Sequence, residues 1–208
     1  MREKIFERKN ELLKAALDEF SSKSYDIASL NMIIKNAKIS KGTFYYHFAD
    51  KEELYLYLVK SAFYEKWDFI NGKSQTEQDL FNNGTIFEKF KLQSKFGAEF
   101  ASKYPLYYKL GNMLSKENSH PIYEKVKLDL NIDTHNILNS MIDEAISKGE
   151  IRNDFPRDFL VKTLSYLFSS FDRIFNSNDE CDLDDTLSNL DMYFDLIQNG
   201  IENKKGGI

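Results

Sequence analysis

Apolar residues recur every three or four positions along most of the chain, which is the spacing of one face of an α-helix. Near the N-terminus Leu12, Ala16 and Phe20 share such a face, and Lys9 continues the same spacing. The sequence therefore predicts a first amphipathic helix. Three prolines and nine glycines leave few turns, which favours long helices over a many-stranded sheet. We expect an all-α protein of about nine helices, one of them running from Ile122 to Lys148.

Two short helices separated by a tight turn follow the first one. The pattern predicts a helix over residues 28–37, a turn at 38–39 and a second helix over residues 40–48. Within the second helix Phe44 and Phe48 lie four positions apart, so both can face inward. This spacing is that of a helix-turn-helix, which places its second helix in the major groove of DNA.

The other faces of that second helix carry hydrogen-bond donors. Ser40 is a candidate N-cap, because its hydroxyl can accept an orphan backbone N–H of the first turn. Thr43 and Tyr46 are predicted to reach base edges, and the other donors to hold phosphates. Asp50 and Glu53 resemble a capping box for the following helix. The predicted DNA-binding residues are Ser40, Lys41, Thr43, Tyr45, Tyr46, His47 and Lys51.

Residues 25–54 resemble the DNA-binding domain of TetR/AcrR-type transcriptional regulators. The resemblance rests on the run from Ile39 to Phe48, followed by Lys51 and Leu54. It implies a three-helix helix-turn-helix domain that binds a double-stranded DNA operator. The division that it implies is a DNA-binding domain at residues 1–50 and a larger helical bundle for ligand binding and dimerisation at residues 51–208. The alternative, a helical subdomain without DNA contact, stays open.

Two residues depart from the family's pattern. Lys38 stands in the turn where the family usually has glycine, so a non-glycine residue would have to accept a positive φ there, at roughly 1 kcal/mol or more. Ile34 stands where the family favours a small residue, near the crossing of the two short helices. Both departures bear on the crossing angle of the motif rather than on its presence.

The body is rich in aromatic residues, with 17 phenylalanines and 12 tyrosines in the whole chain. A mostly apolar cavity with a few polar groups is the usual form of a small-molecule site, and the resembled family commonly binds an effector that releases DNA. Plain core packing is the alternative for each of these side chains. The predicted effector-binding residues are Phe63, Tyr64, Trp67, Phe96, Phe100, Tyr104 and Tyr107.

The last two predicted helices carry apolar residues in steps of four and three, which is a heptad-like seam. In the resembled family the last two long helices form a four-helix dimer interface. The alternative is that both stripes pack into the core of a single chain. The predicted dimer-interface residues are Leu164, Leu167, Phe171, Ile174, Leu187, Leu190, Phe194 and Ile197.

The net charge of −5 conceals an uneven distribution. Residues 1–51 hold ten lysines and arginines against seven acidic residues, so the basic end is the end with the motif. The single cysteine, Cys181, excludes an internal disulfide and is compatible with a reducing cytoplasm. No apolar run approaches the roughly 20 residues of a membrane span, and the N-terminus lacks the apolar core of a signal peptide. We therefore expect a cytoplasmic protein with no membrane contact.

Catalytic and metal-binding patterns are missing from the sequence. The three histidines are far apart, and no HExxH or CxxC spacing occurs, so we expect no metal site. Neither a GxGxxG, a P-loop nor a GxSxG motif is present, so we expect no cofactor and no enzyme.

The sequence thus favours a ligand-responsive transcriptional regulator, and a repressor in particular. It would bind a palindromic operator as a homodimer and be released by a small apolar or aromatic effector. The predicted helix from Lys51 to Asn71 would couple the effector to the DNA-binding end. The alternative is a helix-turn-helix DNA-binding protein whose C-terminal body binds a protein partner instead of a small molecule.

Overall fold

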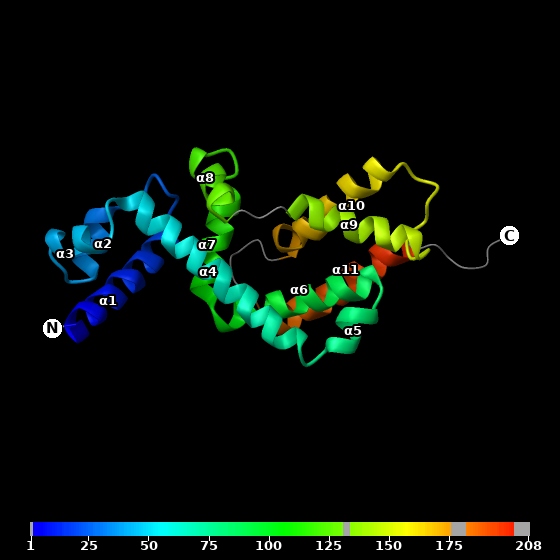
Figure 1. The fold of residues 1–208 in the computed structure, drawn as a ribbon, viewed down its shortest axis with the longest axis horizontal. Helices are drawn as coiled ribbons and strands as arrows, with labels where there is room; N and C mark the ends of the chain where they lie inside the picture. The colour runs from blue at the N-terminus through cyan, green and yellow to red at the C-terminus, as the bar shows by residue number, and fades with distance from the viewer. Residues whose placement is uncertain (1, 131–133, 176–181, 202–208) are drawn as a thin grey trace. The chain divides into compact units, whose positions relative to one another are not determined.

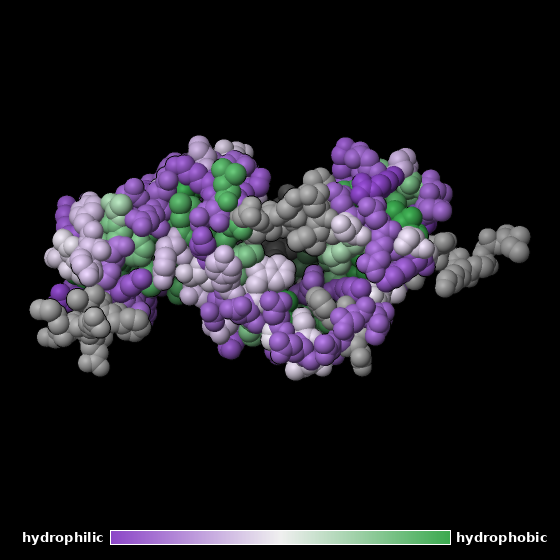
Figure 2. All heavy atoms as spheres, viewed as in Figure 1, coloured by the Kyte–Doolittle hydropathy of each residue, from purple (hydrophilic) through white to green (hydrophobic). Residues whose placement is uncertain are grey.

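The protein is all-α, as predicted. The structure, a computed structural model, describes residues 2–130, 134–175 and 182–201, and the regular elements in these ranges are eleven α-helices (Figure 1). None of these described helices has the length and hydropathy that a membrane crossing needs. On the face that Figure 2 draws, hydrophobic residues reach the surface in separate groups among hydrophilic ones.

The helices follow one another with short connections. They are α1 (Arg2–Phe20), α2 (Leu30–Asn36), α3 (Lys41–His47), α4 (Lys51–Ser74), α5 (Gln78–Asn83), α6 (Ile86–Lys103), α7 (Pro105–Lys116), α8 (Pro121–Leu130), α9 (Thr134–Ser147), α10 (Arg157–Phe175) and α11 (Leu183–Ile201). The single helix expected from Ile122 to Lys148 corresponds to the described helices α8 and α9, and residues 131–133 between them lie outside the described residues. The short helix α5 was not among the nine helices expected.

By packing, the chain divides into two compact units. Unit one comprises residues 1–67 and 104–132, and unit two comprises residues 68–103 and 133–208. Unit one therefore joins α1 to α3 and most of α4 with α7 and α8. The functional division predicted from the sequence, at residue 50, is a different kind of boundary and stays a prediction.

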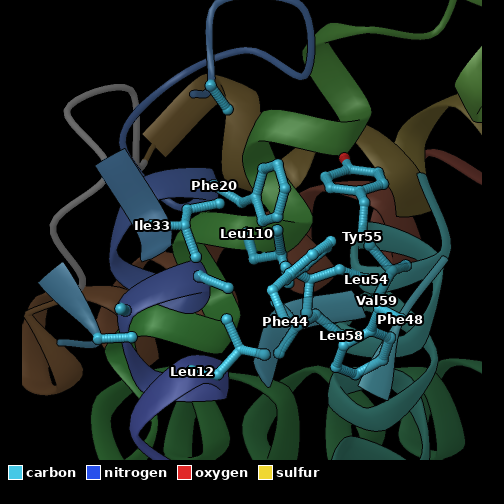
Figure 3. Packing of buried hydrophobic residues seen from close by; sticks show 14 of the residues in the cluster. Leu12, Phe20, Ile33, Phe44, Phe48, Leu54, Tyr55, Leu58, Val59 and Leu110 are labelled. Atoms are coloured by element: carbon cyan, nitrogen blue, oxygen red, sulfur yellow. The ribbon is translucent and has the colours of Figure 1, made fainter. Parts of the chain in front are cut away.

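The core of unit one holds the helix-turn-helix in place (Figure 3). Leu12 of α1, Ile33 of α2 and Phe44 of α3 are fully buried in it, and Leu110 brings α7 into the same cluster. Fully burying one such side chain contributes about 1.5–3 kcal/mol. These residues fix three helices against one another, so α3 cannot turn without disturbing the core.

The turn between α2 and α3 takes the conformation that the resemblance implies for a glycine position. Lys38 has a φ of 54°, the positive value expected of the glycine it replaces. Its N–H donates to the carbonyl of Lys35 (3.1 Å), and the N–H of Ile39 donates to the carbonyl of Ile34 (3.3 Å). These are the two bonds of a Schellman motif, which satisfies the last carbonyls of α2 and offsets the cost of the positive φ.

Unit two is a separate helical cluster built from α6, α9, α10 and α11. The rings of Phe90 and Phe168 stack with centres 3.9 Å apart, and the Tyr193 hydroxyl donates to the carbonyl of Leu167 at 2.8 Å. Glu150, after α9, accepts the N–H of Ile86 at 2.7 Å and so caps the start of α6. The two C-terminal helices are thereby fixed within their own unit.

Candidate nucleic-acid interface

Local hydrogen bonds at Ser40 begin the recognition helix α3. The Ser40 hydroxyl accepts the N–H of Thr43 at 3.0 Å, and the two side-chain oxygens lie 2.9 Å apart. Phe44 is fully buried, and Phe48, the C-cap residue, is 4% exposed. The N-cap and the two inward-facing rings predicted from the sequence are therefore confirmed.

The opposite face of α3 is presented to solvent. Tyr45 is 58% and Tyr46 is 73% exposed, although a tyrosine ring is large and partly apolar. Lys41 is also exposed, and Thr43 is half-buried. Solvent therefore reaches two phenol groups and one ammonium group on the face that faces away from the core.

His47 ends α3 in a different environment. Its Nε2 atom is buried without a hydrogen-bond partner among the described residues, and its ring lies edge-on to Tyr46, with centres 5.0 Å apart. Burial, and then the charge of Lys9, lower the pKa of the imidazole. His47 is therefore neutral near pH 7 in the free protein.

Lys9 is a residue of this region that sequence reasoning missed as a functional candidate. Its ammonium lies 4.9 Å from the centre of the Tyr57 ring and 5.9 Å from that of Phe48. Such cation–π contacts hold a cation against aromatic faces. The available signal was a lysine within the apolar stripe of α1. The structure places this charge beside the C-terminal end of the recognition helix.

Lys51 is engaged within the protein. Its ammonium donates to the carbonyl oxygens of Tyr25 (2.8 Å) and Ala28 (3.2 Å), and lies 4.4 Å from the centre of the Tyr25 ring. Two of its three donors are used in this way. The predicted contact of Lys51 with a phosphate stays a prediction, because only its third N–H would be left to donate to DNA. In the structure Lys51 holds the turn before α2.

Three further carboxylates brace the motif. Asp50 accepts the N–H of Glu53 at 2.8 Å, which confirms its half of the predicted capping box at the start of α4. Glu53 accepts the N–H of Ala49 at 2.6 Å, one residue before the position that a capping box requires. Glu19, 6% exposed, accepts the N–H of Ser29 at 2.9 Å. Burial acts to raise the pKa of Glu19, but hydrogen bonds to it outweigh burial and lower the pKa.

The aromatic residues predicted to bind an effector fall into two groups. In unit one the ring of Phe63 lies 5.7 Å from that of Tyr64 and 5.9 Å from that of Trp67, all on α4. The rings of Tyr104 and Tyr107, at the start of α7, are 6.1 Å apart. Unit one thus holds five of the predicted residues, on two of its helices.

The remaining two belong to unit two. Phe96 and Phe100 of α6 are each 3% exposed. Phe96 clusters with Ile70 and Leu92, and the ring of Phe100 lies 5.8 Å from that of Phe69. Their surroundings are those of core residues, and a shared site with the group in unit one stays a prediction.

A pocket in unit two includes none of the predicted effector residues. It lies at the start of α6 and along α9. The ammonium groups of its lysines and the carboxylates of its glutamates lie near the surface. Its lining consists of Ile86, Lys89, Met141, Glu144, Ala145, Lys148 and Glu150.

Most of the residues predicted for a dimer interface lie in the core of their own unit. Five of them are at most 8% exposed: Leu164, Phe171, Leu190, Phe194 and Ile197. Leu167 and Leu187 are partly buried against the same core, and Ile174 is 53% exposed. Seven of the eight predicted interface residues therefore pack within the core of one chain, which was the alternative considered from the sequence. Their contact with a second chain stays a prediction.

Other apolar residues of α10 and α11 are exposed in their place. Phe159 and Tyr166 are 52% and 59% exposed on α10, and Met192 and Leu196 are 61% and 72% exposed on α11. Together with Ile174 we call these the α10–α11 face. Periodicity alone could not separate this face from the buried seam beside it.

Comparison with known proteins assigns the N-terminal segment. The sequence profile of bacterial regulatory proteins of the tetR family matches residues 12–58. The biofilm operon icaADBC HTH-type negative transcriptional regulator IcaR of Staphylococcus aureus (strain Newman) is 29% identical over 174 residues, which are 83% of this chain and 89% of that protein.

Solved structures share the fold over nearly the whole chain. A TetR family transcriptional regulator from Chloroflexus aurantiacus J-10-FL superposes with a TM-score of 0.72 at 19% identity, covering 97% of this chain and 98% of that one. The transcriptional regulator FadR from Bacillus subtilis, solved in complex with stearoyl-CoA, superposes with a TM-score of 0.67 at 19% identity, covering 93% and 100%. The family is one of regulators, not of enzymes. With the helix-turn-helix geometry, the matched profile assigns residues 12–58 to the tetR family of bacterial regulatory proteins.

Proposed function

We propose that the protein is a repressor that binds an inverted-repeat operator as a homodimer and releases it on binding a small effector. The observation that carries the proposal is the exposed face of α3, where Tyr45 and Tyr46 are held outward while Phe44 and Phe48 anchor the helix. The name of the Staphylococcus aureus relative, a negative transcriptional regulator, supports repression.

The proposed contacts with DNA follow the predicted division of labour. Lys41 and Tyr45, with Ser40 and His47, hold phosphates, and the third donor of Lys51 adds to them. Thr43 and Tyr46 reach or flank base edges in the major groove, where each base pair presents a distinct pattern of donors and acceptors. Lys9 adds a cation beside the end of α3, so it contributes to the sequence-independent part of the affinity.

The proposed dimer contact is the α10–α11 face. Its members are large apolar side chains that are more than half exposed in the single chain, for example Tyr166, Ile174 and Leu196. Burying apolar surface stabilises by roughly 25 cal/mol per Å², so a second copy that covers this face gains from each residue. A two-fold axis through the face would pair two recognition helices with an inverted repeat.

The proposed effector is a small molecule of apolar or aromatic character that contacts the aromatic residues of unit one. Burial, followed by the nearby carboxylate of Glu65, raises the pKa of the Tyr107 hydroxyl, which therefore stays neutral and can orient a ligand. Trp67 and Phe63 lie on α4, the same helix that begins at Lys51 beside α3. To lower the affinity for operator DNA a hundredfold, the effector needs to bind one conformational state of the protein more favourably than the other by only about 2.7 kcal/mol. The relative FadR, bound to stearoyl-CoA, supports a ligand with a long apolar part.

Selection of binding sequences from random duplexes tests the proposal. The purified protein is expected to enrich an inverted repeat whose half-sites lie about 34–36 Å apart, or a multiple of that distance. Failure to enrich any sequence, under conditions where the protein is folded, would remove the DNA-binding proposal.

A further inference from the structure

The turn between α7 and α8 holds the turn between α1 and α2, although the two are far apart in sequence. Glu117, the C-cap residue of α7, accepts the backbone N–H of Tyr25 through Oε1 at 2.8 Å. His120, three residues on, has its Nε2 atom 3.2 Å from a carboxylate oxygen of Asp26. Beyond these, Lys125 of α8 forms an ion pair with Glu52 of α4 at 2.6 Å. Three successive contacts therefore join α7 and α8 to the helix-turn-helix.

Tyr25 is the residue at which these contacts meet. Its N–H is held by Glu117, and its carbonyl accepts a hydrogen bond from Lys51, the first residue of α4. Its ring lies 5.0 Å from the ring of Tyr55 and 5.8 Å from that of His120. A displacement of Glu117 would therefore pass through a single residue, Tyr25, to Lys51 and to the start of α4, which directly follows the recognition helix.

We propose that Glu117 is a positioning residue for DNA binding, which fixes the orientation of α3 by holding the backbone of Tyr25 in place. The proposal rests on the proposed function, since it assumes that α3 reads DNA. It differs from the coupling predicted through α4, because it starts from the C-terminal end of α7.

The carboxylate of Glu117 lies in a partly buried polar environment beside Tyr55. Its second oxygen, Oε2, is buried without a hydrogen-bond partner among the described residues, and so is the hydroxyl oxygen of Tyr55. Figure 3 shows that hydroxyl directed away from the aliphatic side chains of the core. Burial, and then the charge of Glu117, raise the pKa of the Tyr55 hydroxyl. A glutamine would accept the same N–H without burying a charge, so Glu117→Gln separates the effect of the acceptor from that of the charge.

The place of Glu117 on α7 gives the contact a second consequence. Tyr104, the N-cap residue of α7, and Tyr107 in its first turn are predicted effector residues at the other end of this helix. A helix transmits an axial shift along its length, because its backbone hydrogen bonds hold each turn to the next. An effector that moves the first turn of α7 would therefore draw Glu117 away from Tyr25 and release the orientation of α3.

Three variants of the full-length chain test the positioning role. Glu117→Ala removes the acceptor, Glu117→Gln keeps it, and Glu124→Ala is the matched control, since Glu124 is exposed on α8 and pairs with Lys127 of the same helix. Each protein is titrated with a duplex carrying the selected operator and with the same duplex scrambled, at a temperature where circular dichroism shows it folded. Amide exchange at Tyr25 is followed in parallel.

The ratio of operator affinity to scrambled affinity distinguishes positioning from folding. For Glu117→Ala we expect this ratio to fall by about tenfold or more, within the usual range of couplings between sites. Affinity for the scrambled duplex should stay within about twofold, because the phosphate-binding charges remain. The Tyr25 amide should exchange faster, while Glu117→Gln and Glu124→Ala keep the wild-type ratio.

Several results would overturn the proposal. An unchanged ratio in Glu117→Ala, with faster exchange at Tyr25, would show that the contact exists without positioning α3. A ratio lost equally in Glu117→Gln would show that the charge matters and not the acceptor. If Glu117→Ala does not fold, Glu117→Met replaces it, and failure of both would assign a purely structural role. A wild-type protein without any sequence preference would instead remove the proposed function itself.

Discussion

The ammonium group of Lys51 donates a 2.8 Å hydrogen bond to the carbonyl oxygen of Tyr25 and lies over the ring of the same residue. This arrangement separates Lys51 from Lys41, the other lysine assigned to phosphates by sequence, which is exposed. One lysine is fixed inside the motif, and the other is available at its surface. The two should therefore differ when each is replaced.

Replacement of the two lysines by alanine gives the first prediction. Lys41→Ala should weaken binding to all duplexes alike and lower the slope of log affinity against log salt by about one charge, with the thermal midpoint unchanged. Lys51→Ala should also destabilise the fold, by about 1–3 kcal/mol, because two partly buried carbonyl oxygens lose a charged donor. Equal thermal midpoints for the two variants would contradict the structural role of Lys51.

Thr43 supplies the second prediction, on sequence preference. Thr43→Val removes the hydroxyl while keeping the branched shape, and should change the preferred base at one operator position by about 1–3 kcal/mol. Thr43→Ser keeps the hydroxyl and serves as the control. Repeating the selection from random duplexes with each variant gives the measurement. An unaltered operator with Thr43→Val would assign base readout to other residues, with Tyr46 the first to be examined.

Local signals in the sequence sufficed for the recognition motif. The N-cap at Ser40 and the inward spacing of Phe44 and Phe48 depend on residues within a few positions of one another, whereas the positive φ at Lys38 was expected from the glycine usual in the resembled family. Cap, turn and helix periodicity are local physics, so a single sequence reveals them. The helix-turn-helix was predictable for this reason.

Long-range contacts were not predictable in the same way. Glu117 and Tyr25 are joined across 92 residues, and no local sequence pattern around either residue indicates that they are in contact. The seam of α10 and α11 shows the second limit. The spacing of apolar residues identified the apolar sides of the two helices. Phe194, however, is buried within one chain, whereas Leu196, two residues later, is 72% exposed. Periodicity identifies the apolar sides of a helix and leaves open what covers them.

The loss of stability at acidic pH gives the third prediction. Hydrogen bonds lower the pKa of Glu19 in the folded state, so the folded state favours its ionised form more than the unfolded state does. The stabilisation is therefore present above the unfolded pKa, near 4.3, and is lost as the pH falls through the lower folded pKa. Glu19→Gln should reduce the free energy of unfolding at pH 7. Below about pH 5 this free energy should fall less steeply in the variant than in the wild type.

Urea unfolding of both proteins across pH 3–7 measures this effect. Glu124→Gln, at an exposed carboxylate of α8, is the control and should leave the curve as it is. If Glu19→Gln and the wild type lost stability in parallel below pH 5, Glu19 would not be the carboxylate responsible.

The dimer contact gives the fourth prediction, which contrasts an exposed residue with a buried one. Leu196→Asp places a charge on the α10–α11 face and should yield a folded monomer, because Leu196 is 72% exposed in the single chain. Phe194→Asp, at a position that is 4% exposed, should unfold unit two instead, since it buries an unpaired charge. Sedimentation velocity with circular dichroism separates the two results. A wild-type monomer at micromolar concentration would end the proposal.

The last prediction concerns the effector and uses Trp67, the single tryptophan of the chain. Trp67 is 38% exposed on α4, and its ring lies 5.9 Å from that of Phe63, so its emission responds to whatever fills the space beside it. An apolar or aromatic effector should change this fluorescence and release operator DNA over the same range of concentration, because one binding event would cause both. Phe63→Ala should weaken both responses together, whereas Phe155→Ala, at an exposed ring of unit two outside the α10–α11 face, should leave both unchanged. A panel of apolar compounds, long-chain acyl-CoA among them, that leaves both signals flat would favour a body that binds a protein partner. A compound that releases DNA without changing the Trp67 signal would place the effector site elsewhere in the molecule, and the pocket along α9 would then be the next region to test by substitution of Met141.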